Sequence, residues 1–300
     1  MSDASDETAR EDTQSAATDG QSTGGSDSRE EFSRSEAALE SLHDVATDQS
    51  LDTEEKIRAM LAVGTDRLDT ATGLLARIED DTWEVVTVAG DTDGIEEGLT
   101  QPLSTTYCRH TIDTDDPVGF ADLSSGEVAD DPAREWSDQE CYFGASVSVA
   151  GERYGTVCFV DPEPRQEPFT DREFTFAELL TDWIHYLLEQ SRYERELERE
   201  QAFTESVIDS LPNPLYAFDE GGRLIRWNDR LASVTGRESD DLDGLTPADL
   251  VADADRERLE AAFAEVKAGE HTALEVDLAS ADGHRPYELS GAPLRDGTDT

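Results

Sequence analysis

The chain has 300 residues, of which 36% are hydrophobic and 32% charged, so it has room for about two domains with cores of ordinary size. Its 71 Asp and Glu residues outnumber its 24 Lys and Arg residues, giving a formal net charge of -47. The sequence has no basic stripe that could release phosphate counterions, so we expect no nucleic-acid binding through this segment. No apolar run approaches the roughly 20 residues of a membrane span, so we expect no membrane insertion and a cytoplasmic location.

The sequence opens with a polar segment. Residues 1–28 are mostly Ser, Thr, Asp, Gly, Gln and Glu and contain no aromatic residue. Such a segment buries too little apolar surface to offset its ordering entropy, so we expect a disordered acidic tail. Apolar residues then recur at helical spacing over 29–47. A second helix is expected to begin at a cap formed by Asp52 or Thr53.

After the second helix the periodicity changes to short β-type runs, which we expect to pair as hairpins. The predicted strands are 71–78, 82–89, 117–122, 141–149 and 153–160. Residues 103–112 are predicted to form a short helix among them. Helices and antiparallel strands in this order predict an α+β domain with one central sheet flanked by helices.

A long helix is predicted to follow. It begins with a capping box, Thr170-x-x-Glu173, and contains no glycine or proline up to residue 211. Apolar residues fall at helical spacing at both ends, but between them only Tyr193 and Leu197 are apolar. The pattern predicts a rod that is buried in a domain at each end and is solvated in between, or paired there with a second copy as a coiled coil. Homodimerisation through this rod is therefore a hypothesis.

The second domain is expected to have the same class of architecture. Residues 215–219 and 223–227 predict a hairpin, Asn228 a short helix, and Asp253 the cap of a longer helix, before two alternating segments close the sequence. The long helix is expected to enter the core of this domain through its last apolar residues, Val207, Ile208 and Leu211.

Four segments of the first domain together resemble a GAF domain. They are LHDVA (42–46), PLSxxYCRHTI (102–112), FGAxV (143–147) and GTVCFVD (155–161). The resemblance covers about residues 38–190 and implies a sensory domain of the kind that precedes kinases and regulators in bacteria and haloarchaea. It also implies that the helix carrying Cys108 borders a ligand cavity.

The second domain resembles a PAS domain over about residues 206–294. The resemblance lies in IxxLPxP (208–214), IRWN (225–228), VTG (234–236) and the final hairpin. A PAS sheet has a fifth, central strand followed by an output segment in sensor proteins. We therefore expect that residues 206–300 lack the final strand. Either the sequence is a fragment, which we favour, or the sheet has a gap that is open to a partner.

Two groups of residues are candidates for ligand binding. They are Tyr107, Cys108, Arg109, His110, Trp227 and Asn228. A cysteine beside Arg and His can have a lowered pKa and act as a redox sensor or an attachment point, and its Cys-x-His order resembles the bilin site of phytochromes. The alternative is that the first group packs a helix, with Arg109 structural, and that Trp227 and Asn228 are structural too.

The remaining cysteines and the known catalytic motifs point to no further chemistry. Cys141 and Cys158 lie in predicted strands and are expected to be core residues, and the three cysteines have no zinc spacing. We find no phosphate-binding loop and no phosphoacceptor-histidine box, so no catalytic residue is predicted and enzyme activity is left open. The cofactor, if any, is unknown.

These expectations combine into a cytoplasmic sensory module. It has a GAF-like domain (29–188), a helical connector (189–205) and a PAS-like domain (206–300), and it relays the binding of an unknown small ligand or a redox change along the connector. The alternative is the sensory region of a histidine kinase or of a helix-turn-helix transcriptional regulator whose output domain lies beyond residue 300.

The charge predicts the salt conditions under which the protein folds. Acidic residues occur throughout the sequence, whereas only two lysines are present, Lys56 and Lys267. This composition resembles that of proteins from salt-in haloarchaea, which implies a halophilic, archaeal protein. The alternative is an acidic protein that binds basic partners.

We expect the helical circular dichroism signal to fall as KCl is lowered from molar to millimolar concentration. At molar salt the Debye length is roughly 3 Å and repulsion among the acidic side chains is screened, whereas at low salt it is not. A KCl titration followed by circular dichroism measures the effect. A fold that is fully retained at low salt would contradict halophilic adaptation.

Overall fold

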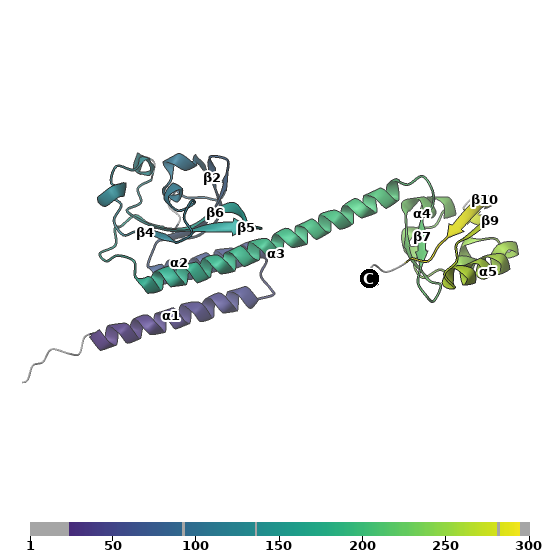
Figure 1. Ribbon diagram of the computed structural model, residues 1–300, viewed down its shortest axis with the longest axis horizontal. Helices are drawn as coiled ribbons and strands as arrows, with labels where there is room; N and C mark the ends of the chain where they lie inside the picture. The colour runs from purple at the N-terminus through teal and green to yellow at the C-terminus, as the bar shows by residue number, and fades with distance from the viewer. Residues whose placement is uncertain (1–23, 92–93, 136, 281–282, 295–300) are drawn as a thin grey trace, which may run out of the picture. The chain divides into compact units, whose positions relative to one another are not determined.

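The computed structural model describes residues 24–91, 94–135, 137–280 and 283–294 (Figure 1). The chain forms two compact units that divide between Tyr193 and Glu194. Helix α1 begins at Gly24, ahead of the boundary expected at residue 29, and the rest of the predicted tail, 1–23, lies outside the described residues. No helix in the described ranges combines the length and apolar character needed to cross a membrane.

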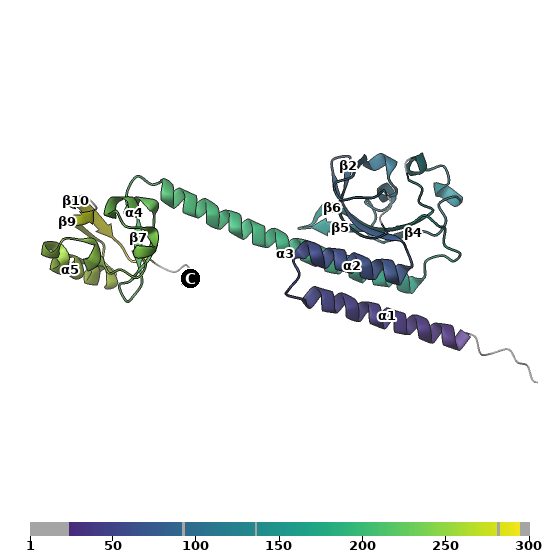
Figure 2. The same ribbon diagram turned by 180° about the vertical axis from the view of Figure 1, so that it is seen from behind.

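The first unit is built on one antiparallel sheet with strand order β3-β2-β1-β6-β5-β4. Its strands are β1 (Thr72–Glu79), β2 (Thr82–Gly90), β3 (Thr100–Pro102), β4 (Val118–Phe120), β5 (Cys141–Val149) and β6 (Glu152–Asp161). Helices α2 (Thr53–Leu68) and the start of α3 (Asp171–Ser210) lie along one face of the sheet, and α1 (Gly24–Thr47) lies outside them (Figures 1 and 2). The predicted α+β class is confirmed.

Both predicted helix starts are formed as expected. The Asp52 side chain accepts a hydrogen bond from the Glu55 amide, and the Glu55 carboxylate accepts one from the Asp52 amide. At α3 the Thr170 hydroxyl accepts from the Glu173 amide at 3.3 Å while the Glu173 carboxylate accepts from the Thr170 amide at 2.7 Å. Each box satisfies two amide groups that the helix itself leaves without partners.

The predicted helix over 103–112 is wrong in form. The segment makes two short 3-10 turns, η1 (Leu103–Thr105) and η2 (Tyr107–His110). Thr106 between them is extended, with φ -116° and ψ 153°, and its hydroxyl donates to the Leu103 carbonyl. Threonine side chains that bond to nearby carbonyls in this way compete with a continuous helix.

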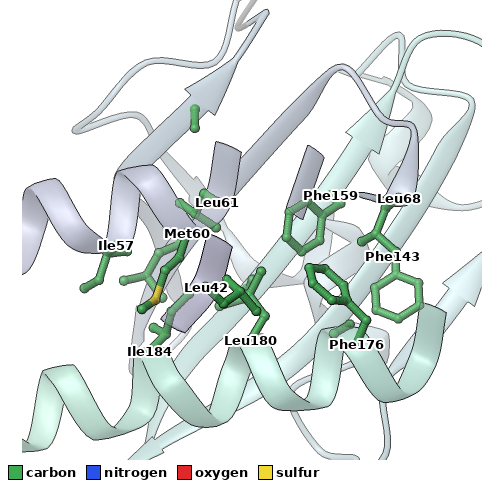
Figure 3. Packing of buried hydrophobic residues seen from close by; sticks show 14 of the residues in the cluster. Leu42, Ile57, Met60, Leu61, Leu68, Phe143, Phe159, Phe176, Leu180 and Ile184 are labelled. Carbon is green, nitrogen blue, oxygen red and sulfur yellow. The ribbon is translucent and has the colours of Figure 1, made fainter. Parts of the chain in front are cut away.

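The central strands of this sheet are buried on both faces. In β6, Val157 and Phe159 point to the helices, whereas Cys158 and Val160 point to the opposite face. Figure 3 shows the helix side, where two rings from the sheet meet aliphatic side chains of all three helices. The labelled residues are Leu42, Ile57, Met60, Leu61, Leu68, Phe143, Phe159, Phe176, Leu180 and Ile184. The opposite face is covered by the 3-10 turns and the loops between β2 and β5.

The second unit carries two antiparallel hairpins. Its elements are β7 (Tyr216–Phe218), β8 (Leu224–Trp227), α4 (Asp229–Thr235), α5 (Arg256–Lys267), β9 (Thr272–Ser280) and β10 (Gly283–Gly291). Among the described residues β7–β8 and β9–β10 form separate two-stranded sheets, where one sheet was expected. Asn228 caps α4 as predicted, and residues 281–282, between β9 and β10, lie outside the described residues. That residues 206–300 lack the final strand of a PAS sheet stays a prediction.

The two halves of α3 differ in burial. Leu180 and Ile184 are fully buried in the first unit, as expected. The expectation that the far end enters the second core is wrong for Val207 and Leu211, which are 45% and 40% exposed, and only Ile208 is half-buried. Hydrogen bonds to the main chain, described below, hold this end of the helix in place of apolar packing.

Candidate functional site

The predicted candidate group on η2 splits into an inner and an outer pair. Tyr107 and Cys108 are buried on the sheet face opposite the helices, with 5% and 3% exposure. The side chains of Arg109 and His110 are about one third exposed. A 3-10 turn has three residues per turn, so neighbouring side chains point in different directions, and the four residues do not converge on one point.

Arg109 and His110 are both held by Asp131. The Arg109 Nη2 and the His110 Nε2 lie 2.5 Å and 2.6 Å from the same carboxylate oxygen. The other oxygen accepts the Ala133 amide at 2.9 Å, and only 1% of the Asp131 side chain is exposed. Arg109 also donates to the Ser104 carbonyl at 2.7 Å. This geometry agrees with a structural role for Arg109, which fastens η2 to the loop before β5.

Cys108 contacts Cys158, the cysteine of strand β6. Its Sγ lies 3.1 Å from the Sγ of Cys158, which is 1% exposed. The Trp83 indole Nε1–H donates to Cys108 Sγ at 3.1 Å. The Cys158 thiol lies 3.3 Å from the Thr156 hydroxyl, and both cysteines are free. Two thiols 50 residues apart in the sequence therefore form one buried cluster.

The two thiols of this cluster differ in acidity. Burial raises the pKa of the Cys108 thiol, but hydrogen bonds outweigh burial and lower that pKa to about 7. The contributing side chains are Cys158, Thr156, Tyr142 and Trp83. Burial, followed by the bond to Cys108, raises the pKa of Cys158 well above its ordinary value. The expected lowering of the Cys108 pKa is present, but its cause is this cluster, since Arg109 and His110 are bound to Asp131.

Tyr142 closes the cluster beneath the sheet. Its hydroxyl lies 2.7 Å from the Thr111 hydroxyl and 3.5 Å from Cys158 Sγ, and burial raises its pKa. Gly144 leaves room for this arrangement, because a Cβ there would collide with the Tyr142 hydroxyl and crowd Thr111. Cys158 was expected to be a core residue because it lies in a predicted strand, but nothing in the sequence pattern indicated that it meets Cys108 or Tyr142.

The third cysteine has a different environment. Cys141 is in the helix-side core, and burial raises its pKa to about 12. Within the described parts of the chain, no three His, Cys, Asp or Glu side chains are grouped so that they could hold a metal ion. The chemistry available to this unit therefore centres on the Cys108–Cys158 pair.

In the second unit, Asn228 joins three segments of the chain. Its side-chain oxygen accepts from the amides of Leu215 and Leu231, at 2.8 Å and 3.2 Å. Its NH₂ group donates to the carbonyls of Ile208 and Asn213, at 3.1 Å and 3.0 Å. Both polar atoms of the Asn228 side chain are hydrogen-bonded, and the residue has no exposed surface. This geometry agrees with a structural role rather than with ligand binding.

A cavity of about 870 Å³ opens in the second unit, and its lining includes three hydrogen-bond partners of Asn228, namely Ile208, Leu215 and Leu231. Trp227, whose indole donates to the Ser239 hydroxyl at 2.8 Å, is not among its lining residues, and neither is Asn228. Its walls come from β7, α5 and the two strands of the last hairpin. They include Tyr216, Phe218, Leu259, Phe263, Leu274 and Leu289. The cavity is mainly apolar, and burial raises the pKa of Tyr216.

Comparison with known families matches one part of the chain. The family model described as PAS fold matches residues 208–299. The match lies where the PAS-like domain was expected. Comparison with curated proteins found no match.

Three solved structures illustrate the similarity of the first unit. One is the phycocyanobilin-bound GAF domain of a cyanobacterial phytochrome, at 15% identity over 55% of this chain and 96% of that one, with a TM-score of 0.43. Another is the GAF domain of an Acinetobacter phosphoenolpyruvate-protein phosphotransferase, at 9% identity over 56% and 98%, with a TM-score of 0.44. The third is free methionine-R-sulfoxide reductase from Neisseria meningitidis with its substrate, at 13% identity over 54% and 93%, with a TM-score of 0.43. No residue role carries over at these identities.

We expect Asp131→Ala to destabilise the first unit by about 2 kcal/mol, because it removes the common acceptor of Arg109, His110 and the Ala133 amide. Urea unfolding in molar KCl measures the change. Asp130→Ala is the matched control, since Asp130 is exposed and makes no comparable contact. Equal stability of the two variants would contradict the anchoring role of Asp131.

Proposed function

We propose that this chain is a sensory module of signal transduction, in which the first unit receives an input and α3 relays it to the PAS-fold segment. The input is the binding of a small ligand or a change of redox state, and the setting is the cytoplasm of a halophilic archaeon. The PAS-fold match and the α+β architecture of the first unit support a sensory role.

Helix α3 is the observation that carries the proposal. It is one helix of 40 residues, from Asp171 to Ser210. Its first half is fixed in the first unit by Leu180 and Ile184, which have no exposed surface. In its last turn, the carbonyl of Ile208 accepts from Asn228, which caps α4. A rotation or shift of the buried half would travel along the hydrogen-bonded rod to that cap.

The exposed side of α3 supports pairing with a second copy. Four large apolar residues there, and Leu211 directly after the helix, are separated by combinations of three- and four-residue steps, the heptad spacing of a coiled coil. They are Tyr186, Tyr193, Leu197, Val207 and Leu211, and each is at least 40% exposed. We propose a parallel homodimer in which these residues form the seam, and in which a change of pairing is the relayed signal.

If α3 relays a signal, a change in the first core should alter hydrogen exchange in the second unit only while α3 is unbroken. Leu180→Ala leaves a cavity in the first core, and we expect it to lower hydrogen-exchange protection in β8, α4 and β9. Glu198 lies in the exposed part of α3, and a proline there costs about 3 kcal/mol or more of helix stability. In the Glu198→Pro background, Leu180→Ala should therefore leave the protection of the second unit unchanged. Exchange followed by mass spectrometry compares the variants.

The control for the helix break is Glu198→Ala, which keeps the helix and should keep the response. If Leu180→Ala changes the second unit equally with and without the proline, then α3 does not carry the signal. If it changes the second unit in neither background, the two units are energetically independent.

The dimer predicts an effect at one exposed leucine. Leu197→Glu places a charge in the proposed seam and should shift the protein from dimer to monomer at high KCl, as measured by light scattering. Ala202→Glu adds the same charge at an exposed position away from the seam and should leave the dimer intact. A monomer in the unaltered protein at high concentration would refute the pairing.

A further inference from the structure

The sulfur atoms of Cys108 and Cys158 are close enough to form a disulfide bond after a small movement. The sulfurs lie 3.1 Å apart, and a disulfide bond is about 2.05 Å long, so bond formation needs an approach of about 1 Å. One sulfur is on β6 at the centre of the sheet and the other is on a single 3-10 turn. The turn can supply the movement while the sheet stays fixed.

We propose that Cys108 and Cys158 form a redox switch that small hydroperoxides oxidise to an intramolecular disulfide and that dithiols reduce again. If the disulfide switch is the input signal of the module, the proposal rests on the sensory function proposed above and specifies its input. The formation of the disulfide itself depends only on the first unit.

The surroundings assign different roles to the two sulfurs. Cys108 Sγ accepts from the Trp83 indole and is 3.1 Å from Cys158, so its thiolate is stabilised without a cation. The pKa of Cys108 is lowered while that of Cys158 is raised. Cys108 is thus the attacking sulfur, and Cys158 stays a thiol until Cys108 has been oxidised.

The chemistry balances in two steps. The Cys108 thiolate attacks one oxygen of the hydroperoxide, the O–O bond breaks, and the leaving oxygen takes a proton and departs as water or an alcohol, leaving a sulfenic acid. The Cys158 sulfur then attacks the Cys108 sulfur as its proton is lost. The S–O bond breaks, a second water leaves, and the S–S bond forms. Two thiols have been oxidised by two electrons in total and the peroxide reduced by two.

Burial selects the oxidant. Both sulfurs are at most 3% exposed, and the side chains of Tyr107 and Tyr142 pack beside them. A bulky disulfide oxidant cannot reach them in the folded unit, whereas hydrogen peroxide, which is little larger than water, needs only a local opening of η2. That opening is limited by the two bonds of Arg109 and His110 to Asp131.

The test treats the full chain, folded in molar KCl, with hydrogen peroxide and removes the peroxide. The protein is then unfolded in urea with iodoacetamide, which blocks the remaining thiols, and disulfides are mapped by mass spectrometry. We expect two of the three thiols to be lost together, a Cys108–Cys158 cross-link to appear, and dithiothreitol to restore all three thiols. A protein that keeps three free thiols while folded, and forms the cross-link only after unfolding in urea, would overturn the switch.

Single variants separate the roles of the sulfurs. Cys158→Ser should form no disulfide and should leave a sulfenic acid at Cys108 that dimedone traps when the peroxide is removed and the protein is unfolded in the presence of dimedone. Cys141→Ser is the matched control, a buried cysteine in the other core, and should give the same disulfide yield as the unaltered chain. A lower yield in Cys141→Ser, or a dimedone adduct at Cys158 in Cys108→Ser, would contradict the assignment.

Hydrogen exchange in oxidised and reduced protein distinguishes the switch from the relay. A disulfide with altered protection in β8, α4 and β9 supports both proposals. A disulfide without that change supports the switch as a modification site and overturns its use as an input. The relay itself is tested separately by the Leu180 and Glu198 variants, which contain no redox step.

Discussion

The first unit depends on a sheet that is buried on both faces. Each central strand must present side chains to two different cores, and β6 does so with Val157 and Phe159 on one face and Cys158 and Val160 on the other. The helix face is filled mainly by apolar side chains. The other face is covered by short turns, and turns and strands together place hydroxyl, indole and thiol groups there. The Cys108–Cys158 pair lies on the second of these faces, among the polar side chains.

Local signals predicted local structure well. The cap at Asp52 or Thr53 and the capping box at Thr170 were predictable because capping requires particular side chains at particular positions. The hairpins followed from the period of two. The contact between Cys108 and Cys158 was not predictable in this way, because it depends on which strands pair and on where a loop crosses the sheet. Asp131 gave no signal either, since it is one of 71 acidic residues and only its burial distinguishes it.

The end of α3 shows a second limit of sequence patterns. Helical spacing of Val207, Ile208 and Leu211 indicated an apolar stripe, but a stripe does not specify what covers it. In the described chain the adjoining core is closed by its own leucines, among them Leu224 and Leu231. Val207 and Leu211 are therefore left exposed. Their exposure contradicts the expected entry into the second core, and it makes them available for the proposed dimer interface.

The hydrogen bonds of Asn228 determine what deamidation of this residue would do to the second unit. The site uses an acceptor oxygen toward two amides and a donor NH₂ toward two carbonyls, and only a side-chain amide offers both. Aspartate, abundant elsewhere in this chain, would turn a carboxylate oxygen toward the carbonyls of Ile208 and Asn213. Hydrolysis of this one amide to a carboxylate would therefore break the contact of Asn228 with Ile208 of α3, and the bond from the Asp229 amide to the Asp209 carboxylate would remain as a link between α3 and α4.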